Sequence, residues 1–580
     1  MRVLGIEGTA WAASAAVYDS ADDSVFIESE AYLPDSGGIH PREAAEHMHE
    51  AIPRVVDRAL DHAVETVEPS ASETIDDGHS PPVDAVAFSR GPGLGPCLRI
   101  VGTAARALSQ TLGVPLVGVN HMVAHLEIGR HTSGFDDPIC LNASGANAHL
   151  LAYRNGRYRI LGETMDTGVG NAIDKFTRHV GWSHPGGPKV ERAAEDGEYV
   201  DLPYVVKGMD FSFSGIMSAA KDAYDDGVPV EDVCFSLQEN VFAMLTEVSE
   251  RALSLTGNDE LVLGGGVGQN ARLREMLAEM CDQRGAKFHA PEPKFLRDNA
   301  GMIAVLGAKQ YAAGDTLEIA NSQVNPSFRP DEVPVTWRSG AGGGYEVRDE
   351  RRIDGAEAVV TLEPEAGRVI KRRLPKTYRH PDLDARLRRE RTTLEARLTS
   401  LARREGVPTP LVRDVDTQEA TIEFEYVGAT DLRDGLTVDR VRDVAVALAR
   451  IHGAGFVHGD LTTRNVRVGE NSRELSANSM DEESFTNSMN EESSANDTDE
   501  GPSTNGTGRT YLIDFGLGYH TDHVEDYAMD LHVFDQSLVG TADDPDPLRK
   551  AVREAYLEAG ERAVLDRLRE VEGRGRYAGG

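Results

Sequence analysis

Residues 3–19 read VLGIEGTAWAASAAVYD, which predicts a strand, a glycine turn and a second strand. Backbone N–H groups around Gly8 and Thr9 could meet a phosphate in that turn. Residues 261–277, LVLGGGVGQNARLREML, predict a strand, a glycine-rich turn and a helix, which brings backbone close to a nucleotide at a helix N-terminus. A third glycine turn follows a strand in LNASGANAHLLAY, residues 141–153. A tight packing turn explains each one alone equally well, but the three together favour a nucleotide-binding cleft.

The pattern of the whole chain predicts two domains. Residues 1–330 alternate apolar strand-like runs with helical patterns, and the paired turns favour two related α/β lobes, as in the actin/hexokinase-like ATPase fold. Prolines and glycines in 331–350 indicate a linker. From 351 to 580, two strand-like runs precede strongly helical, arginine-rich sequence, which indicates an α+β domain. Residues 468–509 are rich in Ser, Asn and Glu and predict a disordered acidic insertion within a hairpin.

The stretch HMVAHLEIGRH, residues 121–131, places His121 and His125 on one helical face, as in a zincin. Met122 stands where a zincin has its catalytic glutamate, and Ile128 stands where the longer metzincin motif has glycine. The two histidines therefore predict a metal site without its own base. We expect His131 to be a surface or loop residue.

Composition limits the class of protein. The chain has 580 residues and a net charge of −36, and only 10 of its 60 basic residues are lysines. An acidic, lysine-poor composition is typical of proteins from a high-salt cytoplasm, where salt screens the self-repulsion. The four cysteines form no C-x-x-C pair, and neither a signal peptide nor a membrane span is visible. We expect a cytoplasmic protein that does not bind membranes.

The second half carries the motif order of a kinase. VHGDLTTRN, residues 457–465, provides Asp460 to accept a hydroxyl proton and Asn465 to hold Mg²⁺. Asp514 in YLIDFGLG would hold Mg²⁺ on the ATP phosphates. Lys371 in RVIKRRL fits the phosphate-pairing lysine, and Glu390 fits its helical ion-pair partner. A chance array of helix caps and turns is the alternative, and the combined order argues against it.

This half departs from larger kinases. No G-x-G-x-x-G precedes the lysine, so DGAEA, with Gly355, Ala356 and Glu357, is the expected nucleotide loop. Glycine replaces the arginine before the catalytic aspartate, and no A-P-E follows Asp514, so activation-loop regulation and peptide docking are not expected. The run IKRRLPKTYRHPDLDARLRRERTTLEARL, with HGDLTTRN and IDFGLG, resembles the small atypical Ser/Thr kinase of the KEOPS complex. That resemblance implies a Mg-dependent ATPase that supports tRNA chemistry. The arginine-rich helix around Arg386 to Arg391 and the C-terminal GRGRYAGG are candidate tRNA contacts by charge, although a solvated helix face explains the former equally well.

Residues 1–330 resemble the tRNA adenosine threonylcarbamoyltransferases, the catalytic subunits of KEOPS. The matching pieces are GIEGTA, SRGPGLGPCLR, HMVAH, SGAN, MDTGVGNAIDKF, HPGGPKVE, KGMDFSFSG, GGGVGQN and RDNAGMIA. The resemblance implies transfer of a threonylcarbamoyl group from its adenylate to the exocyclic amine of the adenosine 3′ of the anticodon, in tRNAs reading codons that begin with adenine. It also implies a separate synthase for the adenylate, and two further KEOPS subunits, one small and dimerising, the other kinase-binding.

The resemblance further implies site residues. His121, His125 and Asp298 would bind one Fe²⁺ or Zn²⁺. The family has a tyrosine where this chain has Asn142, which puts that metal contact in doubt. The implied substrate-binding residues are Asn142, Ala143, Ser144, Gly145, Ala146, Asp174, Gly187, Glu191 and Asn270.

Three other functions stay open at this point. A metalloprotease follows from the histidine pair, a protein kinase with a non-catalytic N-terminal domain follows from the second half, and a sugar kinase follows from the fold alone.

Overall fold

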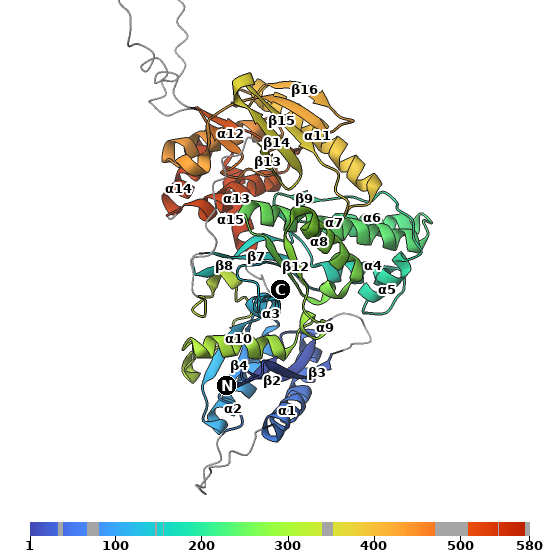
Figure 1. Ribbon diagram of the computed structural model, residues 1–580, viewed down its shortest axis with the longest axis vertical. Helices are drawn as coiled ribbons and strands as arrows, with labels where there is room; N and C mark the ends of the chain where they lie inside the picture. Colours follow the sequence, from blue (N-terminus) through green and yellow to red (C-terminus); the bar gives the residue numbers. More distant parts are fainter. Residues whose placement is uncertain are drawn as a thin grey trace, which may run out of the picture. The chain divides into compact units, whose positions relative to one another are not determined.

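The computed structural model divides the chain into two compact units (Figure 1). Unit 1 comprises Met1–Arg348 together with Lys376–Asp384, and unit 2 comprises Asp349–Pro375 and Ala385–Ala578. In the part of the chain that the structure describes, no helix is long and apolar enough to cross a membrane. The described residues are 1–32, 39–66, 81–145, 148–154, 156–338, 352–469, 509–542 and 544–574.

The first lobe of unit 1 is a five-stranded sheet in the order β3-β2-β1-β4-β5. The first three strands are antiparallel neighbours, and β4 and β5 continue the sheet in parallel with β1. Helices α1 and α2 share one apolar cluster with the sheet. The bounds are β1 Arg2–Glu7, β2 Ala12–Asp19, β3 Ser24–Ala31, β4 Ala85–Gly91, β5 Leu116–Asn120, α1 Pro41–Glu65 and α2 Gly95–Leu112.

The second lobe repeats this topology. Its sheet has the order β8-β7-β6-β11-β12, again with three antiparallel strands followed by two parallel ones. The repeat confirms the prediction of two related α/β lobes. The bounds are β6 Ile139–Ala143, β7 Ala148–Arg154, β8 Arg157–Glu163, β11 Glu260–Gly264 and β12 Lys287–His289.

Helix α10 (Ala300–Ala312) packs against the first sheet, helix α3 (His121–Ser133) packs against the second sheet and the edge of the first, and the two helices pack against each other. Their apolar cluster contains Val117 of the first sheet and Val262 of the second, so the two helices join the lobes. The opposite face of the second sheet packs against α7 and α8. The remaining elements of this lobe are α4 Val169–His179, α5 Gly187–Ala194, β9 Val206–Lys207, β10 Asp210–Phe211, α6 Ser214–Asp225, α7 Val230–Thr256, α8 Ala271–Arg284 and α9 Pro293–Leu296.

The predicted linker begins too early in the sequence. Val333 and Val335 are buried in unit 1, and Arg338 donates to the Asp136 carbonyl, so residues 331–338 are packed rather than free. Residues 339–350 lie outside the described residues. The segment Lys376–Asp384, predicted as part of the kinase domain, also belongs to unit 1.

Unit 2 begins with an antiparallel five-stranded sheet in the order β13-β14-β15-β17-β16. The two predicted strand-like runs form β14 and β15. Alternation along β15 buries Lys371 and Arg373 on one face and exposes Arg372. The bounds are β13 Arg352–Asp354, β14 Ala358–Glu363, β15 Arg368–Arg373, β16 Val412–Asp416, β17 Thr421–Glu425 and α11 Pro381–Arg404.

The rest of unit 2 is mainly helical, around one apolar cluster. Strands β20 (Val466–Val468) and β21 (Thr510–Leu512) pair antiparallel, which confirms the predicted hairpin around the insertion. Residues 470–508 of that insertion lie outside the described residues. The other elements are β18 Thr430–Asp431, α12 Val438–Gly453, β19 Phe456–Val457, β22 Tyr519–His520, α13 Val524–Thr541, α14 Asp546–Ala559 and α15 Arg562–Arg574.

Candidate functional site

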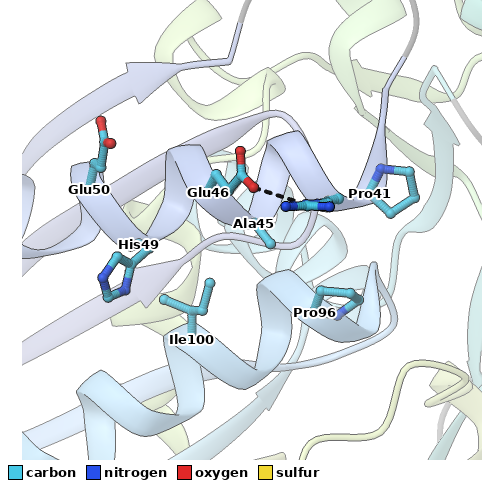
Figure 2. A pocket seen from close by; sticks show the side chains of 8 residues that line it. Pro41, Ala45, Glu46, His49, Glu50, Pro96 and Ile100 are labelled. Atoms are coloured by element: carbon cyan, nitrogen blue, oxygen red, sulfur yellow. Dashed lines mark hydrogen bonds and ion pairs between the residues drawn. The ribbon is translucent and has the colours of Figure 1, made fainter.

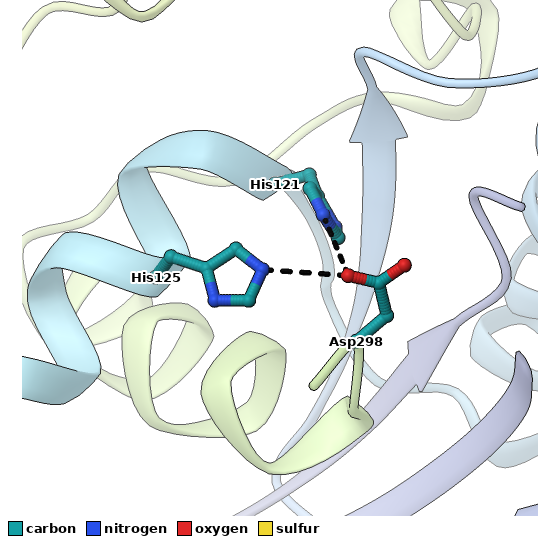
Figure 3. Close-up of side chains that lie close together, drawn as sticks. All are labelled: His121, His125 and Asp298. Atoms are coloured by element: carbon teal, nitrogen blue, oxygen red, sulfur yellow. Dashed lines mark ion pairs between the residues drawn. The ribbon is translucent and has the colours of Figure 1, made fainter. Parts of the chain in front are cut away.

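Helix α3 and the loop before α10 bring together three candidate metal ligands (Figure 3). Asn120 caps α3 by accepting from the N–H groups of Met122 and Val123, which fixes His121 as the first residue of the helix. His125 follows one turn later on the same face. The Asp298 Oδ1 atom lies 3.3 Å from His121 Nε2 and 3.5 Å from His125 Nε2.

The residues present fit a metal ion. The three ligand atoms lie within 4.8 Å of one another. His125 is 1% exposed, and neither of its ring nitrogens makes a hydrogen bond. A buried polar atom without a partner is costly, and the contact with Asp298 does not provide that partner. The His125 imidazole is therefore placed to bind a further ligand. Two imidazoles and a carboxylate suit Fe²⁺ or Zn²⁺ with open positions.

Glu7, at the end of β1, orients the first ligand. Its buried carboxylate accepts from the Thr9 N–H at 2.7 Å and lies 3.1 Å from His121 Nδ1. Such a contact directs Nε2 of the imidazole toward the metal position. Burial alone lowers the pKa of His121, but Glu7 and Asp298 raise it to about 10. Burial lowers the pKa of His125.

The predicted substrate turn lies beside the metal ligands. An added Cβ at Gly264 would lie 3.5 Å from both Asn142 Oδ1 and His125 Cβ, so these two residues flank the same glycine. Asn142 is fully buried, and its Oδ1 has no hydrogen-bond partner. Gly265 has φ +84°, and a Cβ there would meet the Ala143 carbonyl at 2.3 Å, so only glycine fits this close approach.

The turn at Ser144 and Gly145 meets the N-terminus of α4. The carbonyls of these two residues accept from the N–H groups of Gly170 and Asn171, respectively. Ala146 lies outside the described residues. The structure therefore joins two of the sequence motifs, SGAN and MDTGVGNAIDKF, at one turn.

The remaining predicted substrate residues form two groups. Asp174 accepts from the Gly186 N–H at 2.8 Å and lies 3.1 Å from His184 Nδ1. Gly186 directly precedes Gly187, the first residue of α5. Glu191 and Asn270 meet at the N-terminus of α8. The Glu191 carboxylate accepts from the Ala271 N–H at 2.7 Å, and the Asn270 side chain caps the helix.

In unit 2, a cluster of buried charges surrounds Lys371. Its Nζ lies 2.8 Å from Glu395 Oε1 and 2.6 Å from Asp514 Oδ1. Arg373 contacts the other oxygen of the Glu395 carboxylate at 2.7 Å. One glutamate on α11 thus contacts two cations of β15.

The sequence predicts Glu390 as the ion-pair partner of Lys371, and this prediction is wrong, because the partner is Glu395. Glu390 is exposed, whereas Glu395 is fully buried. Five helical residues rotate the side chain by about 140°, so the two glutamates project from different faces of α11.

The predicted catalytic loop of unit 2 is closely ordered. Asn465 Nδ2 donates to the Asp460 carbonyl at 2.7 Å. The buried carboxylate of Asp530, on α13, accepts from the N–H groups of His458 and Gly459, so α13 fixes the loop that carries Asp460. Sequence reasoning missed Asp530 because nothing near it in the chain marks it as a partner of this loop.

The predicted nucleotide loop of unit 2 is a hairpin turn. Gly355 and Ala356 join β13 to β14, and the Gly355 N–H donates to the Ala358 carbonyl. Glu357 pairs with Arg391 at 2.7 Å, so this arginine, one of the predicted tRNA contacts, already has an acidic partner.

Comparison with known proteins decides the family. Residues 23–305 match the family model of tRNA N6-adenosine threonylcarbamoyltransferase. The chain is 64% identical over 589 residues to a bifunctional tRNA threonylcarbamoyladenosine biosynthesis protein of Haloarcula marismortui, with 100% of both chains covered. Proteins of the same name are 66% identical over 580 residues in Halobacterium salinarum and 48% identical over 577 residues in Methanospirillum hungatei, with at least 99% of each chain covered. The chain belongs to this family.

Membership of the bifunctional tRNA threonylcarbamoyladenosine biosynthesis family confirms the resemblance seen in the sequence, and the relatives from Haloarcula marismortui and Halobacterium salinarum agree with a composition typical of a high-salt cytoplasm. It also favours a transferase over the metalloprotease. Met122 is buried and its Sδ accepts from Asn142 Nδ2 at 3.6 Å, so a thioether lies where a zincin has its base.

The expectation for His131 is met in part. His131 lies within α3 and not in a loop, and its partly exposed side chain lies 2.9 Å from the exposed Asp23 at the surface. Glu7 was missed, although an acidic residue that ends a buried strand beside a glycine turn was an available signal.

An open hollow of about 620 Å³ lies between α1 and α2 (Figure 2). Arg42 and Glu46, which both line it, form an ion pair at 3.0 Å. None of the candidate metal, substrate or ATP residues lines this hollow, so it is separate from the sites described above. The lining residues are Pro41, Arg42, Ala45, Glu46, His49, Glu50, Pro96 and Ile100.

Proposed function

We propose that unit 1 transfers a threonylcarbamoyl group from threonylcarbamoyl-adenylate to the exocyclic amine of the adenosine 3′ of the anticodon, in tRNAs reading codons that begin with adenine. The observation that carries the proposal is the placement of the His121–His125–Asp298 triad beside the glycine turns at Asn142 and Gly264. A metal site beside a glycine turn, where a substrate can approach the backbone closely, suits an acyl-adenylate. A tRNA substrate and a synthase-made donor place this reaction in the cytoplasm.

The metal and the chain have separate roles in this proposal. His121, His125 and Asp298 would hold Fe²⁺ or Zn²⁺, which supplies a Lewis acid for carbamoyl and phosphate oxygens. Asn142 to Ala146, with Asp174, Gly187, Glu191 and Asn270, would hold the adenylate.

The reaction needs little more than alignment. The adenosine nitrogen attacks the carbamoyl carbon, a C–N bond forms, the C–O bond to the phosphate breaks, and AMP leaves as the amine loses one proton. Since the adenylate is already an activated donor, holding the two substrates in line could supply most of the rate. This agrees with a site whose central helix carries Met122 in place of a base.

The test combines the full chain with tRNA, threonine, bicarbonate, ATP, a synthase and the remaining KEOPS subunits. Nucleoside mass spectrometry should detect threonylcarbamoyladenosine with the wild type and with His131→Ala, which changes α3 outside the triad. His125→Ala should abolish it. Absence of product with the wild type, or an undiminished amount with His125→Ala, would refute the proposal.

We further propose that unit 2 is a minimal kinase fold with Mg-dependent ATPase activity, or atypical Ser/Thr kinase activity, that supports the transfer. The supporting observation is that Lys371, Glu395 and Asp514 converge while Asn465 contacts the Asp460 loop. Asp460 would accept a proton, and Asn465 and Asp514 would hold Mg²⁺. Fusion in one chain fixes the stoichiometry of transferase and ATPase.

ATP turnover by the full chain tests this second activity. Asp460→Ala should abolish turnover and leave the metal content of the His121 site unchanged. Asp522→Ala, which alters a side chain 97% exposed in the same unit, should retain turnover. Normal turnover by Asp460→Ala would show that this loop does not serve ATP.

A further inference from the structure

Two aromatic rings from the two lobes of unit 1 stack on each other. Trp11 lies in the turn between β1 and β2, and His184 precedes α5. Their ring centroids lie 4.8 Å apart and their planes differ by 7°. Trp182 and Trp337, by contrast, pack against the apolar clusters of this unit. Trp11 is only partly buried, and its aromatic neighbour is a polar ring, so packing alone is a weak reason for a tryptophan here.

This stack lies beside the proposed acyl-adenylate turn. A Cβ added at Gly145 would lie 4.0 Å from both Trp11 Nε1 and Asn171 Oδ1. His184 Nδ1 is 3.1 Å from Asp174, another proposed substrate residue. The stack is therefore next to residues already expected to bind the donor.

The same turn leads back to the metal ligands. Trp11 follows Glu7 by four residues, and the two oxygens of the Glu7 carboxylate contact the Thr9 N–H and His121. The backbone of Trp11 is held as well, since its carbonyl accepts from the Tyr32 N–H at 2.7 Å. Trp11 thus lies in a turn whose first residues contact His121 through Glu7, and its ring lies beside Gly145 of the Ser144–Gly145 turn.

We propose that the Trp11–His184 pair is the site on which the adenine of the target tRNA adenosine stacks. This inference rests on the proposed function, because a base whose exocyclic amine reacts must leave the RNA stack and find another planar partner. Stacking on Trp11 brings that amine beside the turn that would hold the carbamoyl group. The adenylate donor also contains adenine, so the test must distinguish these two sources of one ring.

The experiment measures RNA binding without catalysis. Fluorescence anisotropy is used with the full chain and an anticodon stem-loop that carries either adenosine or an abasic site at the target position. Trp11→Leu should weaken binding of the adenosine stem-loop about tenfold, within the range for loss of one base–aromatic stack. It should change binding of the abasic stem-loop less than about twofold, because the lost contact is to the base itself.

Two variants serve as controls. Trp11→Phe keeps an aromatic face and should recover most of the affinity. Phe26→Leu removes a similar aromatic–histidine stack of the same lobe, in which the ring centroids of Phe26 and His62 lie 4.0 Å apart. This variant should bind both RNAs like the wild type. Equal losses in Phe26→Leu and Trp11→Leu would reduce the effect to damage of the lobe and refute the site.

AMP binding distinguishes the two sources of adenine. The affinity of the full chain for AMP should be unchanged in Trp11→Leu. If AMP binding falls about tenfold while both stem-loops bind normally, the stack holds the donor and the proposal is wrong. Equal weakening of the adenosine and abasic stem-loops would also overturn it. Since neither assay needs transfer, both outcomes are separate from a failure to form threonylcarbamoyladenosine.

Discussion

Glu127 is a fully buried carboxylate on α3 that contacts cations from two helices. Its Oε2 lies 2.7 Å from Lys309 on α10 and 3.1 Å from Arg130, and Tyr158 donates to its Oε1. Burial raises the pKa of Glu127, but Lys309 and Arg130 lower it to about 2, so the group is charged near neutral pH. The Glu127–Lys309 pair joins α3, which carries His121 and His125, to α10, which follows Asp298.

Lys309→Met should therefore destabilise unit 1. Removal of Lys309 takes one of two cations from the buried Glu127 carboxylate, and because Arg130 remains, the cost should lie below the about 3–5 kcal/mol of a buried pair that is broken outright. Calorimetry in concentrated KCl should show a lower unfolding temperature. Lys287→Met breaks the exposed pair with Glu260, whose lysine is 61% exposed, and should change the stability by less than about 1 kcal/mol. Equal shifts for the two variants would contradict this account.

Glu395 and Glu390 provide a matched pair on α11. Glu395→Gln removes the charge that contacts Lys371 and Arg373, so Lys371 should be held less well against the ATP phosphates. We expect kcat/KM for ATP turnover to fall at least about tenfold, equivalent to about 1.4 kcal/mol. Glu390→Gln changes only an exposed side chain and should leave turnover unchanged. The opposite result would restore the original prediction of Glu390.

At the scale of elements, α10 packs on the first sheet through glycines. A Cβ at Gly307 would lie 2.3 Å from Ala87 Cβ, and one at Gly5 would lie 2.5 Å from the Ala300 carbonyl. The loop that ends in Asp298 leads directly into this helix. We therefore expect a change in the distance between α10 and the sheet to move Asp298, the third metal ligand.

Gly307→Ala should weaken metal binding from a distance. The added methyl group forces α10 away from β4, at a cost of about 1–3 kcal/mol for overpacking, and displaces Asp298 from the histidines. Equilibrium dialysis with Zn²⁺ should show a higher dissociation constant. Gly540→Ala, in helix α13 with open space around it, should keep the wild-type affinity. Unchanged Zn²⁺ affinity in Gly307→Ala would show that the loop moves independently of the helix.

The elements were largely predictable, and the long-range contacts were not. Continuous apolar runs locate β1, β6 and β11, which are buried on both faces, and a 3.6-residue period locates α1 and α2, which each bury one face. The pairing of Lys371 with Glu395 depends on which face of α11 is buried. The many arginines of that helix obscure the apolar pattern that would identify this face in the sequence. Asp298 joined His121 and His125 in the sequence reasoning only through a family resemblance, since 173 positions along the chain separate it from His125. The positions of Glu7 and Asp530 likewise follow from folding of distant segments.

At the scale of the whole molecule, the segment Lys376–Asp384 completes the core of unit 1. Tyr378 is fully buried in its apolar cluster. Arg379 pairs with Glu247 at 2.5 Å, and Lys376 pairs with Glu250 at the same distance. Both glutamates are buried on α7, where Arg251 and Arg284 are their other cationic contacts. Two of the cations that pair with α7 therefore come from a segment that follows the first strands of unit 2 in the sequence.

In a chain that ends at Arg338, helix α7 should be less protected against local unfolding. Without the segment, Glu247 and Glu250 each lose a cation, and Tyr378 leaves a cavity in the apolar cluster, so local opening becomes easier. Hydrogen exchange measured by mass spectrometry should be at least about tenfold faster in α7 of the truncated chain. Arg379→Met in the full chain should show part of the same effect, whereas Arg42→Met, at a side chain 91% exposed, should show none. Wild-type protection of α7 in the truncated chain would mean that the segment lies against a core that is already complete.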